Sequence, residues 1–142
     1  MEIGIAVPIM AFALIGGVDL LRVAAVQQAV VNAARVGAEF AAADTTQTDA
    51  AVTAQVTSEL NRTPGLVAAN AVITLPTRNA QGAYQGALAD GTTVCSSTVA
   101  GPPPQPCFIA VSVRYTFRTI VAWPYVPNRA LVDRSAAMPM VD

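Results

Sequence analysis

The sequence contains no histidine, and only 12% of its 142 residues are charged. Histidine is the commonest general base and a frequent metal ligand, so its absence excludes Ser-His-Asp and Cys-His catalytic arrangements. The acidic residues are scattered, without the close pair that glycoside hydrolysis needs. Phosphate-binding glycine motifs and EF-hand spacing are also absent. We therefore expect no enzyme, and no cofactor, metal or small-molecule substrate.

Lysine is absent too: all eight basic residues are arginine, and the net charge is −1. This balance gives no electrostatic reason to expect nucleic-acid binding. Cysteine is scarce, with only Cys95 and Cys107, which flank a proline-rich loop. One such pair in a chain with an apolar N-terminus indicates a disulfide formed outside the cytoplasm, worth ~3 kcal/mol on a chain-entropy model. The alternative is two free, buried thiols.

Residues 3–18 carry no formal charge, and a helical pattern of small residues continues to Ala43. As one helix, about 40 residues at ~1.5 Å each span roughly 60 Å, about twice the ~30 Å apolar core of a bilayer. The first half suits a membrane or a packed apolar shaft, and the second half must project from it. We predict an apolar stalk helix over residues 1–44 and an α+β head over residues 45–142.

Three interpretations of the apolar segment compete. A cleaved signal peptide begins with basic residues, but the first basic residue here is Arg22. A plain membrane anchor fits the length of residues 3–21. A filament stalk is an anchor before assembly and a filament core afterwards. Asp19 and Arg22 share a helix face and can pair, although both could lie at a membrane interface, and Pro8 lacks an N–H and loosens the first turns.

Small residues recur four apart in the second half of this helix. They form two adjacent rows: Ala33, Gly37 and Ala41, and Ala34, Ala38 and Ala42. Such rows let helix backbones approach closely, whereas alanine also favours a helix by itself. Gly37 weakens a helix, so its presence favours packing.

These residues resemble the TadE-like family of pilins and pseudopilins of the tight-adherence (Tad) systems. Family members carry an acid, an apolar run with a proline six residues later, a glycine and a second acid. The matching residues here are Glu2, Pro8, Gly16 and Asp19. Residues 32–42 resemble the family's Asn-Ala-Ala-Arg block, residues 111–117 its alternating strand, and residues 134–138 its final Ser-Ala element.

The resemblance implies a structural subunit that polymerises through its N-terminal helix into an extracellular filament for surface attachment, with an inner-membrane precursor. Its partners would be copies of itself and the Tad-type assembly machinery in the inner membrane. The resemblance also implies that Glu2 pairs with the free amine of a neighbouring subunit. Arg22 of another subunit is a second candidate, and the helix dipole alone also favours an acid there.

We expect the residues that contribute to assembly to be Glu2, Pro8, Asp19, Arg22 and Gly37. Two alternatives to a filament subunit stay open. One is a minor priming pseudopilin. The other is a monomeric inner-membrane-anchored periplasmic module that binds a partner through its head.

Patterns beyond the stalk predict a short helix and a small antiparallel sheet. Thr46 with Asp49 resembles a weak capping signal. An apolar row of Val52, Val56 and Leu60 indicates a helix over residues 48–61, which a Pro-Gly pair then ends. Residues 72–75 suggest a short strand, and residues 77–93 suggest a variable loop or weak hairpin.

Residues 107–117 form the best predicted strand. Alternation places one set on the buried face: Ile109, Val111, Val113, Tyr115 and Phe117. Residues 130–138 would add a last strand. Residues 101–106 suit a rigid connection or a polyproline ligand, and Trp123 in its proline-flanked loop suits a contact patch or a cap on the core. The predicted fold class is therefore α+β, a long N-terminal apolar helix with a short helix and a small antiparallel β-sheet head.

Overall fold

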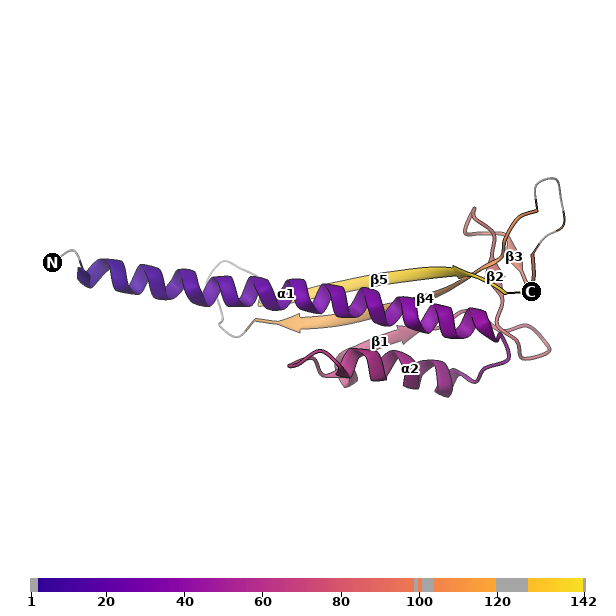
Figure 1. The fold of residues 1–142 in the computed structure, drawn as a ribbon, viewed down its shortest axis with the longest axis horizontal. Helices are drawn as coiled ribbons and strands as arrows, with labels where there is room; N and C mark the ends of the chain where they lie inside the picture. The colour runs from indigo at the N-terminus through magenta and orange to yellow at the C-terminus, as the bar shows by residue number, and fades with distance from the viewer. Residues whose placement is uncertain (1–2, 99, 101–103, 120–127, 142) are drawn as a thin grey trace.

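The computed structural model describes residues 3–98, 100, 104–119 and 128–141 of the chain. Within these residues, a long helix is followed by a second helix and a small sheet (Figure 1). The elements are α1 (Ile3–Ala43), α2 (Asp49–Asn61), the 3-10 helix η1 (Ala68–Asn70), β1 (Ala71–Thr74), β2 (Gly86–Ala87), β3 (Val94–Cys95), β4 (Phe108–Arg118) and β5 (Arg129–Pro139). The sheet is antiparallel, and the predicted α+β fold class is confirmed.

α1 is one continuous helix that passes through two environments. Its first half projects beyond the sheet, and its second half lies against β4, β5 and α2 (Figure 1). The buried apolar side chains of α1 lie between Val26 and Ala42. α1 ends next to the expected boundary at residue 44, but its second half supplies much of the core of the head. That half therefore does not project freely, because the sheet and α2 cover its small side chains.

Gly37 shows how closely α2 and the sheet approach α1. A Cβ at Gly37 would lie 2.5 Å from Cγ2 of Val56 on α2 and 3.3 Å from Cγ1 of Val111 on β4. The other members of the two small-residue rows are also buried: Ala33, Ala34, Ala38, Ala41 and Ala42. The rows pack, as expected, but they pack within the chain. Gly37 is thus covered by α2 and β4 of its own chain, and its expected contribution to assembly stays a prediction.

β4 is the central strand of the sheet. It pairs along its whole length with β5, from Phe108 opposite Pro139 to Arg118 opposite Arg129. Its other edge pairs with β1 and, near Phe108, with β2, which in turn pairs with β3. The predicted alternation is confirmed, because every second side chain of β4 from Ile109 to Phe117 is buried. The strand's other face lies outside the core, and toward the end of the strand it carries the exposed Arg114, Thr116 and Arg118.

The turn between α1 and α2 is capped differently from the prediction. Thr48, and not Thr46, is the N-cap residue of α2, and its hydroxyl accepts a hydrogen bond of 3.2 Å from the Ala51 N–H. Thr46 instead donates its N–H and hydroxyl to Asp44, at 2.9 and 2.6 Å. The predicted apolar face of α2 is confirmed, since Val52, Val56 and Leu60 are buried.

The long segment between β1 and β4 has little regular structure. An isolated bridge joins Arg78 to Tyr84, and β2 and β3 are only two residues each. Gly82 and Gly91 have φ of 83° and 72°, which marks the tight turns that punctuate this segment. Pro102, Pro103 and the loop around Trp123 lie outside the described residues, so both interpretations of each stay predictions.

We expect Gly37→Ala to destabilise the head although alanine favours a helix. Overpacking against Val56 costs ~1–3 kcal/mol, against a gain of ~1 kcal/mol in helix propensity. The thermal midpoint, followed by circular dichroism in detergent, should fall by several degrees. Gly17→Ala is the matched control, because no described atom beyond the adjacent turns of α1 lies within 4 Å of its added Cβ. A Gly37→Ala midpoint equal to that of Gly17→Ala would contradict the close contact.

Candidate functional site

The first half of α1 presents an apolar surface that the described part of the chain leaves largely exposed. The large apolar side chains exposed there are Val7, Ile9, Met10, Phe12, Leu14, Ile15, Val18, Leu20 and Leu21. Leu14, Leu20 and Leu21 are 70–73% exposed. Contiguous apolar surface of this extent is rare on soluble monomers and marks a membrane or protein contact. We call residues 6–21 of α1 the bare segment.

By length and composition, α1 could cross a membrane over the range Ala6–Ala43. A signal sequence near an N-terminus and the core helix of a soluble protein can have the same length and composition. The core-helix explanation fits only the second half, which is buried in the head. The bare segment therefore requires an apolar environment that the described part of the chain does not provide.

Pro8 and Glu2 were expected to act at the start of this helix. Pro8 lies inside α1 and is exposed, and it has no N–H to give to the carbonyl of Gly4. α1 nevertheless runs unbroken through it. Glu2 lies outside the described residues, so its pairing with a neighbouring amine stays a prediction.

Asp19 and Arg22 mark the place where α1 enters the head. Arg22 Nη1 lies 3.4 Å from Asp19 Oδ1, as the three-residue spacing predicted. Asp19 is 5% exposed, and the Arg22 guanidinium carbon lies 5.3 Å from the centre of the Phe117 ring at the end of β4. A cation over an aromatic face is favourable. Arg22 therefore links the Asp19 carboxylate on α1 to the Phe117 ring at the end of β4.

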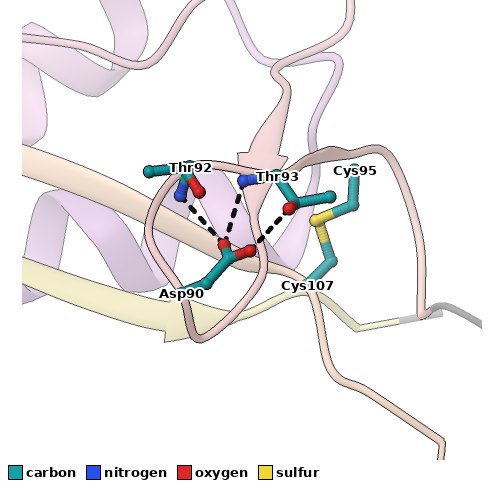
Figure 2. Close-up of a disulfide and its surroundings, with 5 residues drawn as sticks. All are labelled: Asp90, Thr92, Thr93, Cys95 and Cys107. Atoms are coloured by element: carbon teal, nitrogen blue, oxygen red, sulfur yellow. Dashed lines mark hydrogen bonds between the residues drawn. A yellow bond between two sulfur atoms is a disulfide. The ribbon is translucent and has the colours of Figure 1, made fainter.

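The structure contains the disulfide between Cys95 and Cys107, which links β3 to the start of β4 (Figure 2). Both cysteines are buried. Gly86 makes the approach possible, because a Cβ there would lie 2.7 Å from Cys107 Sγ and 2.6 Å from the Phe108 carbonyl oxygen. The sequence gives no signal for this role, since a strand pairing sets the contact. A disulfide is compatible with a location outside the cytoplasm.

A cluster around Arg78 was not predicted. Arg78 donates to Asp49 Oδ1 from Nε at 2.9 Å and from Nη2 at 2.6 Å, and also to the carbonyls of Gln47 and Gly82. The Tyr84 hydroxyl donates to the same Asp49 oxygen at 2.6 Å, and its ring lies under the guanidinium at 3.9 Å. The cluster ties the irregular segment to the first turn of α2.

The ionisable groups of this cluster shift one another's pKa values. Hydrogen bonds from Tyr84 and Arg78 lower the pKa of Asp49, and the bond to Asp49 raises the pKa of Arg78. Burial, and then the bond to Asp49, raise the pKa of Tyr84 to about 12. Asp49 also lies in the first turn of α2, where the helix dipole favours a negative charge. The stable protonation state is thus an ionised Asp49 and Arg78 beside a neutral Tyr84. The role of this cluster is structural.

Titratable or metal-ligating side chains do not cluster elsewhere in the described part of the chain. No three side chains of His, Cys, Asp or Glu come together there as metal ligands. Among the described residues that line the hollow between α1 and the end of β4, which include Arg22, Tyr115 and Phe117, none has a carboxylate side chain. The bare segment is therefore the strongest candidate for a functional surface.

Comparison of the chain with protein-family models, with curated proteins and with solved structures found no match. The fold and the surface define an α+β protein that carries a long, half-bare apolar helix and one disulfide.

We expect the double substitution Cys95→Ser and Cys107→Ser to lower the free energy of unfolding by ~3 kcal/mol, because the bond closes a loop over a sequence separation of 12. Denaturant unfolding with and without reductant measures the effect. The double variant should be insensitive to reductant. An unchanged midpoint for the wild type in reductant would contradict a stabilising bond.

Alkaline pH should weaken the Arg78 cluster. The pKa of Tyr84 is raised to about 12 in the fold, against ~10 for an unfolded tyrosine. The stability that it contributes is therefore complete below ~pH 10 and is lost as the pH rises toward 12. A tyrosinate absorbance titration should show a late-ionising group that Tyr84→Phe removes. A late phase that Tyr84→Phe leaves unchanged would contradict the cluster.

Proposed function

We propose that the chain is a TadE-like pilin, a structural subunit that polymerises through the bare segment of α1 into an extracellular filament for surface attachment. Before assembly the same segment holds the subunit in the inner membrane, where the Tad-type machinery acts on it. The proposal rests on the exposed apolar first half of α1, because the second half of the same helix is packed in the head.

The free energy gained by burying apolar side chains favours a state in which the bare segment is covered. Covering one Leu, Ile, Val or Phe side chain contributes ~1.5–3 kcal/mol, and most large apolar residues of the segment are more than half exposed. Lipid can cover the segment before assembly, and neighbouring subunits can do so afterwards. A single surface thus serves both the precursor and the filament.

The continuity of α1 favours a filament over a plain anchor. The helix passes from the bare segment into the core without a break, so the head is held at a fixed angle to that segment. An anchor works equally well with a flexible joint, whereas a regular polymer requires each subunit to present the same geometry.

The alternative is a monomeric membrane-anchored module outside the cytoplasm. The length of the apolar helix favours it, because one such helix suffices to span a bilayer. In that case lipid, and never another copy, covers the bare segment in the functional state.

Removing bulk from the bare segment separates the two functions. We expect Leu14→Ala with Leu21→Ala, whose side chains are 70% and 73% exposed, to reduce the yield of sheared filaments at least about tenfold, because each change removes ~2 kcal/mol of contact. Membrane recovery should persist, since alanine is still apolar. The yield is measured by digesting and sequencing the purified filaments.

Val31→Ala with Val72→Ala is the control, because both valines are exposed outside the bare segment, Val31 on the second half of α1 at 43% and Val72 on β1 at 61%. This pair should leave the filament yield unchanged. Recovery of the wild-type chain only from membranes, with no filaments, would refute the proposed function and favour the monomeric module.

A further inference from the structure

Two arginines face each other at the end of the sheet nearest the bare segment. Arg118, the last residue of β4, lies directly opposite Arg129, the first residue of β5 (Figure 1). Like charges in this position destabilise a strand pair. Both are exposed, and with Asn70 and Thr116 they line a shallow hollow. We call these four residues the cationic end.

No carboxylate of the described residues forms an ion pair with Arg118 or Arg129. The neighbouring residues 120–127 contain no acid. Most other arginines are paired within the chain: Arg22 with Asp19, Arg35 with Glu39, Arg62 with Glu59, Arg78 with Asp49 and Arg114 with Asp133. The cationic end is thus a local excess of positive charge.

The far end of the head carries the opposite charge. Asp44 follows the last residue of α1, and Asp90 lies in the turn before β3, beside the disulfide (Figures 1 and 2). Both are exposed. Within the described residues, each carboxylate accepts hydrogen bonds from neutral groups only: Thr46 and Gln47 for Asp44, and Thr92 and Thr93 for Asp90. We call these two residues the acidic end.

These hydrogen bonds keep both charges fixed and ionised. The bonds from Thr46 lower the pKa of Asp44. Those from Thr93 and Thr92 lower the pKa of Asp90 to about 2. The head therefore has a fixed negative charge at one end of its long axis and a pair of positive charges at the other.

We propose that the cationic end of one subunit binds the acidic end of the next subunit in the filament. The inference rests on the proposed function and specifies how the heads stack. Two different surfaces at opposite ends of one chain form a head-to-tail contact, and such contacts generate open polymers.

The dimensions of the molecule fit this stacking. The first half of α1, residues 3–21, and its part inside the head, residues 22–43, are each about 20 residues long, or about 30 Å. A neighbour shifted by one head length therefore places its acidic end at the cationic end and its head beside the bare segment. Anionic lipid head groups would account for the arginines, but not for the fixed charge at the acidic end.

Neutral substitutions test the contact in cells that assemble the full chain. Arg118→Gln with Arg129→Gln, and separately Asp44→Asn with Asp90→Asn, should each lower the filament yield at least about tenfold. Asparagine retains Oδ1, which accepts the backbone N–H bonds of both turns, and loses only the bonds that the Gln47 amide and the Thr93 hydroxyl donate to Oδ2. Arg35→Gln with Arg62→Gln is the matched control, because it removes the same charge from exposed surface pairs, which contribute little; its yield should stay within about twofold of wild type.

Salt gives a second measurement. Wild-type filaments should shorten or dissociate near 1 M salt, where the screening length falls to ~3 Å. Wild-type filaments that tolerate this salt, together with full yield of both charge variants, would overturn the head-to-tail contact while leaving the proposed function intact. A wild type that forms no filaments would instead refute the proposed function itself.

Loss of filaments in the arginine variant alone would also overturn the proposal, because the acidic end would then be dispensable. Binding of the full chain to phosphatidylglycerol and phosphatidylcholine vesicles then tests whether lipid head groups bind the cationic end. A preference for phosphatidylglycerol that Arg118→Gln with Arg129→Gln removes would assign the cationic end to lipid head groups.

Discussion

The packing of the second half of α1 against β4, β5 and α2 determines the arrangement of the rest of the molecule. Gly37 and the alanines beside it leave room for Val56 and Val111 to reach the helix backbone. Larger side chains would push the sheet and α2 away and open the core. Because α1 is continuous, this same packing fixes the direction in which the bare segment leaves the head. A contact inside the head thus sets the geometry of the surface outside it.

Sequence periodicity predicted the parts of the fold that repeat locally. The alternation of β4 and the four-residue spacing on α2 each identified a buried face, because one side of each element lies against α1. The fixed spacing of Asp19 and Arg22 on one helix likewise predicted their contact. These inferences needed only the geometry of a single element.

Contacts between distant segments could not be predicted in this way. Arg78 meets Asp49 and Tyr84 only because the irregular segment returns to the first turn of α2. Gly86 is required by the approach of Cys107, which depends on the pairing of β2 with β3 and β4. The small-residue rows predicted close packing, but a sequence does not say whether the packed surface belongs to the same chain. For Gly37 it does.

The bare segment and the two charged ends would act on different properties of a polymer. An apolar helix surface supplies binding energy but little directional information, since apolar contacts tolerate sliding. Fixed charges at opposite ends of the head penalise such sliding, because every displaced register leaves Arg118 and Arg129 opposite each other without an anion. Asp44 and Asp90 are held by their turns and do not follow a moving partner. On this view the bare segment drives the association of subunits, and the charged ends of the head set the axial distance between them.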